Sequence, residues 1–323
     1  MRARIKAMAY TLPEQVLDNH ELARQFPEWT AERIEQKLGI GKRHIAGQSE
    51  CASDLAFFAA EKLLVQNNQK RESVDYLLLC TQSPDYILPT TACILQHKLK
   101  LPTTCGALDY NLGCSGYVYG LGLAKGLIET GQARNVLLLT AETYSKHIEE
   151  SDKNVRTLFG DGAAATWVER IEDATECIGP FVYGTDGSGA ADLMIEAGGM
   201  RMPAGKGDPY LRMNGPAIVA FTLQTVPTAI QQILEKSGLS LDHVDRIVFH
   251  QANAFILEAL RKKAGIPSEK FIYALRDFGN TVSSTIPIAL VEAESAGNLK
   301  PGMRVLLVGF GVGFSWGACL IRW

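Results

Sequence analysis

A cysteine next to a predicted helix start is the first residue of this chain that could do chemistry. Cys114 follows a short extended stretch and precedes the apolar run 118–128, which predicts a buried helix. At a helix N-terminus the first N–H groups lack partners within the helix, and the macrodipole favours negative charge. We therefore expect a stabilised thiolate with amides free to receive an oxyanion. Because a lone cysteine is more often a packing residue, the assignment of a nucleophile depends on its partners.

Two polar residues in the second half of the chain are candidate partners. His250 ends an apolar stretch and precedes an amphipathic helix predicted over 254–264, and such a junction exposes a side chain to a cleft. Asn280 lies between Gly279 and Thr281, where by itself it is typical of a helix cap or turn.

A repeated pattern explains how these residues could meet. Apolar strands at 76–80 and 136–140 alternate with helices at 91–99 and after Cys114, and similar strands recur at 245–250 and 304–308, about 170 residues later. The order predicts a duplicated α/β unit with one shared core and strands buried on both faces. We expect Cys114 and Asn280 to occupy equivalent helix starts and His250 to end a strand, so that all three converge between the halves.

Composition narrows the class of protein. The chain has 323 residues, 46% of them hydrophobic, and a net charge of −3, which gives no electrostatic footprint for nucleic acid or a membrane surface. Seven scattered cysteines without a C-x-x-C pair favour reduced thiols in a cytosol and no metal site. The basic N-terminus predicts a first strand, and the uncharged run 305–321 predicts two strands around a turn. The Gly-rich segment 184–207 predicts either loops over a site or a surface excursion.

Taken together, the candidate residues resemble the 3-oxoacyl-acyl-carrier-protein synthase III group. The matching segments, in family order over essentially the whole chain, are 112–116, 160–163, 250–253, 279–281 and 309–317. The resemblance implies a thiolase-like fold of two α/β halves in five α-β-α-β-α layers. Residues 1–172 would carry the nucleophile, and residues 173–323 the histidine and asparagine.

The chemistry implied by the resemblance is decarboxylative condensation. Cys114 would take an acyl group from acyl-CoA, with amides of Cys114 and Val312 stabilising the oxyanion. His250 and Asn280 would stabilise the enolate formed when a malonyl thioester loses CO₂. Asparagine cannot abstract a proton, so the triad favours a malonyl donor, attached to acyl carrier protein or CoA. The product would be a 3-oxoacyl thioester in fatty acid or polyketide biosynthesis, formed without a bound cofactor.

The resemblance also implies substrate contacts. Trp29, Arg33, Lys153, Arg156 and Asn253 would bind CoA and its pantetheine arm, although extra residues within 33–38 shift the alignment near Arg33. A lysine at 153 replaces a common arginine and so loses the planar fork.

Other features of the sequence concern the carrier protein and the partner subunit. Phe255 and Ala220 stand where family members often carry cations that dock the carrier protein, so recognition would be shifted; Phe255 could instead be a packing residue of its helix. The resemblance further implies a cytoplasmic homodimer in which Leu88 of the partner closes the acyl pocket and admits primers longer than acetyl.

Other functions remain open at this stage. An enzyme of the same fold could pass the Cys114 acyl group to a hydroxyl or amine, or to water as a thioester hydrolase. A non-catalytic subunit need not keep the three residues together. Glu142, which follows a strand near Tyr144, would be catalytic only with a different chemistry.

Overall fold

Two mixed sheets organise the structure, a computed structural model that describes residues 1–323. The first sheet has the strand order β1-β7-β6-β4-β5, in which β4 runs parallel to β5 and β6, and β7 runs antiparallel to β6 and β1. Its strands are β1 (Arg2–Thr11), β4 (Tyr76–Cys80), β5 (Gly106–Tyr110), β6 (Asn135–Glu142) and β7 (Gly162–Ile171).

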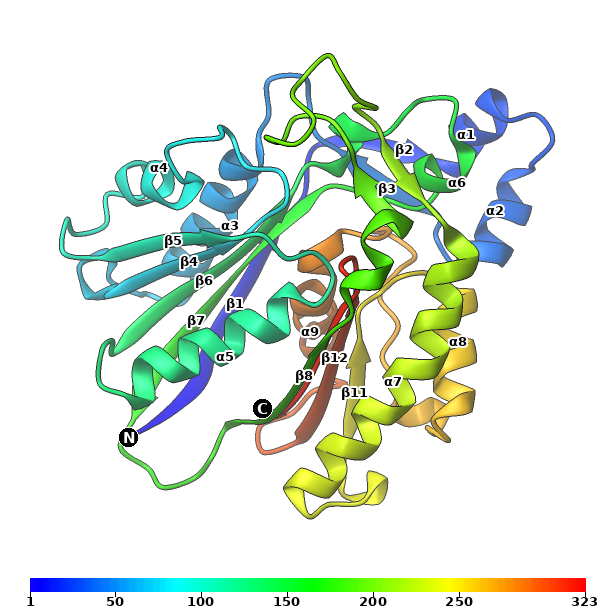
Figure 1. Cartoon of the computed structure of the whole chain (residues 1–323). Helices are drawn as coiled ribbons and strands as arrows, with labels where there is room; N and C mark the ends of the chain where they lie inside the picture. Colours follow the sequence, from blue (N-terminus) through cyan, green and yellow to red (C-terminus); the bar gives the residue numbers. More distant parts are fainter.

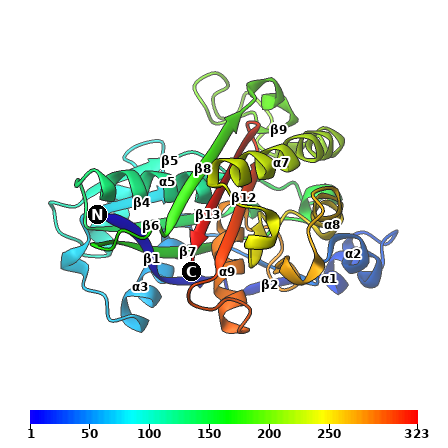
Figure 2. The ribbon, with the colours of Figure 1, turned by 90° about the horizontal axis from the view of Figure 1, so that it is seen from below.

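The second sheet repeats this pattern in the order β11-β12-β13-β8, with β11 parallel to β12 and the other pairs antiparallel. Figure 2 shows β8, β13 and β12 side by side. The strands are β8 (Ile178–Thr185), β11 (Arg246–Phe249), β12 (Arg304–Gly311) and β13 (Ser315–Arg322). The predicted boundary at 172/173 falls between β7 and β8, while the division into two units stays a prediction.

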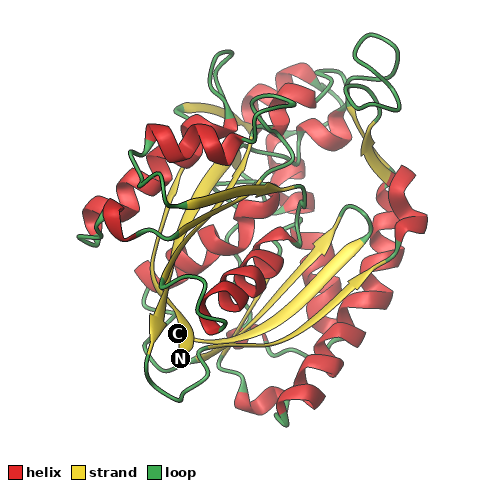
Figure 3. Ribbon diagram, turned by 60° about the vertical axis from the view of Figure 1, so that its left-hand side comes forward, coloured by secondary structure: helices red, strands yellow, loops and turns green.

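Two apolar helices contact strands of both sheets: α5 (Gly116–Glu129) and α9 (Thr285–Ser295) (Figure 1). Because α5 and α9 are buried on most sides, their sequences carry little polarity. The other large helices are α3 (Ala52–Gln66) and α4 (Thr91–Lys98), which pack on the first sheet, and α7 (Gly215–Ser237), which packs on the second and against α8 (Ala254–Lys263) (Figure 3).

Smaller elements surround the strand ends. They are the pair β2 (Gln15–Asp18) and β3 (Lys42–Ile45), the helices α1 (Asn19–Gln25), α2 (Ala31–Leu38) and α6 (Lys153–Arg156), and the pair β9 (Leu193–Ile195) and β10 (Leu211–Met213). Six short 3₁₀ turns complete the chain: η1 (Arg71–Ser73), η2 (Tyr144–His147), η3 (Gly187–Asp192), η4 (Leu241–His243), η5 (Ser268–Lys270) and η6 (Val282–Ser284).

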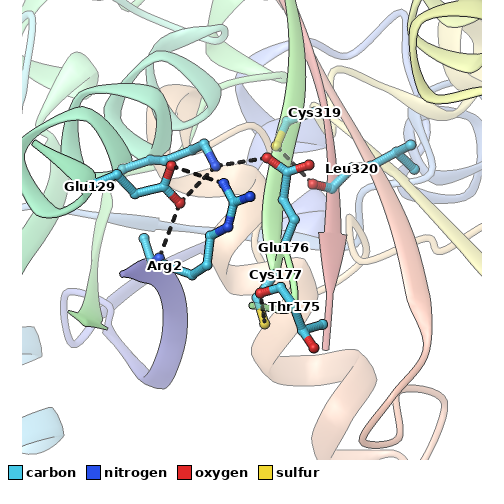
Figure 4. A network of polar contacts seen from close by, with 9 residues as sticks. Arg2, Glu129, Thr175, Glu176, Cys177, Cys319 and Leu320 are labelled. Atoms are coloured by element: carbon cyan, nitrogen blue, oxygen red, sulfur yellow. Dashed lines mark hydrogen bonds and ion pairs between the residues drawn. The ribbon is translucent and has the colours of Figure 1, made fainter. Parts of the chain in front are cut away.

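A polar contact joins the first sheet to the segment that leads into the second (Figure 4). The ammonium of Lys125 in α5 lies 2.9 Å from the carboxylates of both Glu129 and Glu176. Glu129 also accepts the backbone N–H of Ala3 in β1 at 3.3 Å. These bonds fix α5 between β1 and the segment before β8.

Most sequence predictions of elements are confirmed, including the first strand and the two strands within 305–321. Three were incomplete, missing or wrong. The segment 184–207 holds η3 and β9 as well as loops, and the strongly helical α7 was not predicted. The equivalence of Cys114 and Asn280 is wrong in register, because α5 begins at Gly116 but α9 begins only at Thr285, after the extra turn η6.

By length and composition, α7 is also the one helix that could cross a membrane. In this fold it packs against β8, β12, β13 and α8, and buries Phe221, Val226, Ile230 and Ile233. An amphipathic core helix accounts for this composition.

Candidate active site

A cavity of about 140 Å³ brings together the three residues that the sequence singled out. Cys114, His250 and Asn280 all line it, and most of the other lining residues are apolar. The predicted convergence is therefore confirmed. Its apolar walls come from both halves and include Leu158, Phe159, Leu193, Ile218, Val219 and Phe310.

The thiol of Cys114 is protonated in the resting enzyme. The residue is 6% exposed, and burial, assisted by the nearby Glu142 carboxyl, raises the pKa of the thiol to about 12. The prediction of a stabilised thiolate is thus wrong, because desolvation outweighs the favourable backbone groups near the helix start. The proton of Cys114 must leave during the reaction.

Two backbone N–H groups, those of Cys114 itself and of Val312, oppose the rise in the thiol pKa. The β12 end comes so close that a Cβ on Gly311 would lie 2.8 Å from the Cβ of Cys114 and 2.9 Å from its Sγ. Only a glycine at position 311 permits this approach, so the backbone of Gly311 can lie directly against the nucleophile.

His250 is a neutral imidazole. It follows β11, is 2% exposed, and burial lowers its pKa to about 3. Its Nδ1 lies 2.7 Å from Oγ1 of Thr285. This contact occupies Nδ1, and Nε2 can donate a hydrogen bond to the cavity in the tautomer in which the Thr285 hydroxyl donates to Nδ1 rather than to the Val282 carbonyl, 3.0 Å away.

Asn280 is held by backbone contacts between the halves. Its N–H donates to the carbonyl of Leu158, and its own carbonyl accepts the N–H of Gly160, both at 3.0 Å. The side-chain Oδ1 accepts the N–H of Val282 at 2.9 Å. With its oxygen engaged, the carboxamide keeps its N–H groups for the cavity.

The predicted CoA contacts are only partly brought together. The Lys153 ammonium lies 5.8 Å from the ring centroid of Trp29 and 2.7 Å from Glu28. Arg156, also in α6, donates to the side chain of Gln25 at 2.9 Å. Arg33 is exposed, and the structure gives its guanidinium no partner.

Sequence reasoning missed Lys37, whose ammonium lies 4.6 Å from the Trp29 ring centroid. The signal was the extra residues within 33–38. These residues lie within α2, where Lys37 stands one helical turn beyond Arg33 and reaches Trp29.

The remaining predicted residues lie at the cavity rim or on the surface. Asn253 lines the cavity and caps α8 by accepting the N–H of Ile256 at 2.9 Å. Phe255 also lines the cavity but is 65% exposed, so the alternative that it only packs its helix is wrong. Leu88 is 79% exposed and does not line the cavity of its own chain.

Sequence reasoning also left Glu142 without a role. It is fully buried at the end of β6, with no cation within salt-bridge distance. Its pKa is raised to about 8 by burial, against hydrogen bonds from Gln82, Ser83 and Ser283.

A buried cysteine facing two amides, with two uncharged donors across an apolar cavity, defines a thiolase-like enzyme that transfers acyl groups. Comparison with known proteins agrees. Residues 108–187 match the family 3-oxoacyl-[acyl-carrier-protein] synthase III, and residues 234–323 match its C-terminal family. The beta-ketoacyl-[acyl-carrier-protein] synthase III of Caldanaerobacter subterraneus subsp. tengcongensis is 38% identical over 317 residues, which are 97% of this chain and 95% of the relative.

Solved structures extend the match to the whole fold. A crystal structure of a 3-oxoacyl-(acyl-carrier-protein) synthase III is 52% identical, with a TM-score of 0.98 and 100% of both chains covered. The corresponding synthase from Burkholderia xenovorans LB400 is 35% identical, with a TM-score of 0.94 over 100% of this chain and 94% of its own. The chain belongs to the 3-oxoacyl-[acyl-carrier-protein] synthase III family.

Proposed function

We infer that this protein catalyses the condensation of its family: it joins an acyl group from acyl-CoA to malonyl-acyl-carrier protein and forms 3-oxoacyl-acyl-carrier protein. The observation that carries this is the single cavity lined by Cys114, His250 and Asn280. Family membership and the presence of Asn280, which cannot abstract a proton, favour condensation over acyl transfer to a hydroxyl or amine.

The first step loads the enzyme. Sγ of Cys114 attacks the thioester carbonyl of acyl-CoA, and the N–H groups of Cys114 and Val312 stabilise the oxyanion. The carbon–sulfur bond to CoA then breaks, and CoA leaves as a thiol with the proton that Cys114 loses.

The second step forms the carbon–carbon bond. The malonyl thioester loses CO₂, and the electron pair of the broken bond becomes an enolate. Neutral donors from His250 and Asn280 stabilise its oxygen without protonating the carbon. The carbon attacks the acyl group, and the expelled Cys114 thiolate regains a proton from solvent.

For the CoA moiety, we propose contacts with Trp29, Lys37, Lys153 and Arg156 outside the cavity and with Asn253 at its rim. The ammonium groups of Lys37 and Lys153 beside the Trp29 ring support this, since ammonium groups bind phosphates and an aromatic ring can stack on a nucleotide base. Arg33 is the weakest of the predicted contacts, because it lies exposed and unpartnered.

For the carrier protein, we propose a docking face whose rim is apolar at Phe255 and Ala220, with cations only further along α8. There Arg261 and Lys262 already pair with Glu258 at 2.7 and 3.2 Å, which leaves Lys263 as the free cation of that cluster. Turnover with malonyl-carrier protein and with malonyl-CoA across a salt series tests this. A strong carrier preference that collapses with salt contradicts it.

For the assembly, we propose a cytoplasmic homodimer in which Leu88 of the partner subunit closes the acyl pocket. The exposed apolar loop of Tyr86, Ile87 and Leu88 supports an interface. Leu88→Phe should shift primer preference toward shorter chains by about tenfold per step near the size limit. Loading rates for acyl-CoAs of increasing length, with light scattering, measure it; an unchanged profile or a monomer contradicts it.

For the architecture, we propose five layers and two halves, 1–172 and 173–323. The helix contacts support the order α3 and α4, first sheet, α5 and α9, second sheet, α7 and α8.

The decisive test is intact mass spectrometry after incubation with a panel of acyl-CoAs, followed by malonyl-carrier protein. We expect an acyl adduct on the protein that disappears as the 3-oxoacyl product and CO₂ form. An enzyme that gains no adduct, or whose adduct is only hydrolysed, overturns the proposed function.

A further inference from the structure

The two sheets have equivalent strand ends next to the catalytic cavity. Val136 of β6 pairs with the first residue of β4, and Val305 of β12 pairs with the first residue of β11. Counting along the two strands from these pairs, Glu142 and Gly311 occupy the same position. Counting back from the first residues of α5 and α9, Cys114 has Ser283 as its counterpart. The pair of Cys114 and Gly311 is therefore repeated as Ser283 and Glu142.

At the end of β6, Glu142 places a carboxyl group where its counterpart in β12, Gly311, has no side chain. Oε1 of Glu142 lies 3.1 Å from the Ser283 hydroxyl, and Oε2 lies 3.0 Å from the Ser83 hydroxyl. A neutral carboxyl donates its proton to one of these serines and accepts a hydrogen bond from the other. The N–H of Gln82 lies 3.1 Å from both oxygens. Each carboxyl oxygen thus has partners, and these partners come from both halves of the chain.

No positive charge compensates this group. The titratable residues that face Glu142 are Cys80, Cys114, Tyr144 and Asp161, none of which can carry a positive charge. Leaving an unpaired carboxylate in such a place costs several kcal/mol, whereas a neutral carboxyl with hydrogen bonds does not. Burial accordingly raises the pKa of Glu142 to about 8.

The partners of Glu142 lead directly to both catalytic loops. The side chain of Gln82 donates to Oδ1 of Asn111 at 2.9 Å, and its Oε1 would lie 2.6 Å from a Cβ on Gly113, next to the nucleophile. On the other side, Ser283 follows Val282, whose N–H holds the carboxamide of Asn280.

We propose that Glu142 is a positioning residue that acts as an uncharged carboxylic acid, holding the Cys114 loop of one half in register with the Asn280 loop of the other. It contacts no reacting atom in this role. The inference rests on the proposed condensation, because the two loops must cooperate only if the acyl group and the enolate meet between them.

Three substitutions separate position from charge. Glu142→Gln keeps one acceptor and one donor of a neutral carboxyl, so we expect acyl loading and malonyl decarboxylation within about threefold of wild type. Glu142→Leu removes the hydrogen bonds, and we expect both half-reactions to fall by about tenfold or more. The control for loss of a buried hydrogen bond elsewhere is Thr166→Val in β7. It removes a buried hydroxyl that lies 3.3 Å from the hydroxyl of Tyr117.

Loading is followed by intact mass and decarboxylation by CO₂ release, with circular dichroism to confirm folding. Rescue by glutamine but not by leucine supports the proposal. If glutamine is as damaging as leucine in a folded protein, the carboxylate charge is required and the proposal fails. It also fails if leucine leaves both half-reactions intact. Should Glu142→Leu not fold, the Glu142→Gln result and Ser283→Ala, expected to slow decarboxylation more than loading, decide the question. Failure of the condensation itself is visible in the wild-type enzyme.

Discussion

The end of β12 and the end of β6 show how one scaffold position can be made reactive in one half and closed in the other. At the first, Gly311 leaves room for Cys114, and the following N–H groups face its sulfur. At the second, the carboxyl of Glu142 occupies the corresponding space and bonds to Ser283. The strand framework is the same in both places. The comparison shows that the oxyanion site depends on the missing side chain at Gly311 as well as on Cys114.

The neighbouring strands β11 and β4 show the same contrast. His250 follows β11 at the position that Cys80 holds in β4. His250 faces the cavity, whereas the thiol of Cys80 donates to the carbonyl of Leu112 at 2.9 Å and is fully buried. Burial, with the nearby Glu142, raises the pKa of Cys80 far above its ordinary value. Of two buried thiols close to the site, only one lines the cavity.

The largest expected effect comes from removing each of these two thiols in turn. Cys114→Ala should abolish the acyl adduct entirely, while Cys80→Ala should keep it, because only Cys114 lines the cavity and faces the Val312 amide. Intact mass spectrometry after incubation with acyl-CoA measures both. An adduct of unchanged mass in Cys114→Ala would disprove the assignment of the nucleophile.

The next effect separates the two half-reactions. Asn280→Ala removes one fixed donor to the enolate, so malonyl decarboxylation should fall by about 10² to 10³ while loading of Cys114 persists. Rapid-quench loading and CO₂ release, measured on the same preparation, distinguish the steps. Equal losses in both would mean that Asn280 organises the cavity rather than stabilises the enolate.

A smaller effect tests whether glycine is needed at the reactive strand end. Gly311→Ala would place a methyl group 2.8 Å from the Cβ of Cys114, which forces a shift that costs about 1–3 kcal/mol. We expect slower loading and lower stability. Gly126→Ala in α5 is the matched control, since a Cβ there meets nothing within 4 Å and alanine favours the helix by about 0.5–1 kcal/mol. If both substitutions behave alike, the close approach at Gly311 has no catalytic meaning.

Particular residues show what the sequence could and could not predict. The meeting of Cys114, His250 and Asn280 was predictable, because each has a local signature at a strand end or helix start and the repeat places such ends together. The register of Asn280 was not, since the extra turn η6 has no mark in the periodicity. The protonated state of Cys114 was also out of reach, because desolvation depends on the packed structure rather than on the helix start alone.

Surface contacts had a similar limit. Lys37 reaches Trp29 from one helical turn beyond Arg33 in α2, and the sequence showed the extra residues within 33–38 but not that they bring a cation to the ring. Glu142 looked like any polar residue after a strand. Its meaning appears only when β6 and β12 are compared residue by residue.

The last effect concerns the pH dependence of stability and sharpens the contrast between Glu142 and the uncharged Gly311. The pKa of Glu142 is 4.5 as a free group and about 8 in the fold, so between these values the folded state binds a proton that the unfolded state has lost. Its contribution to the free energy of unfolding therefore falls as pH rises from 4.5 to 8.

Glu142→Gln lacks this titration, so its stability relative to wild type should improve from about pH 5 to about pH 8. The contributions of Asp161, whose pKa is raised to about 6, and of His250, whose pKa is lowered to about 3, are present in both proteins and cancel in the difference. Denaturant unfolding of both proteins at the two pH values gives that difference. If the stability of Glu142→Gln relative to wild type stays constant or falls over this range, Glu142 is already ionised at neutral pH, and the two strand ends then differ in charge as well as in shape.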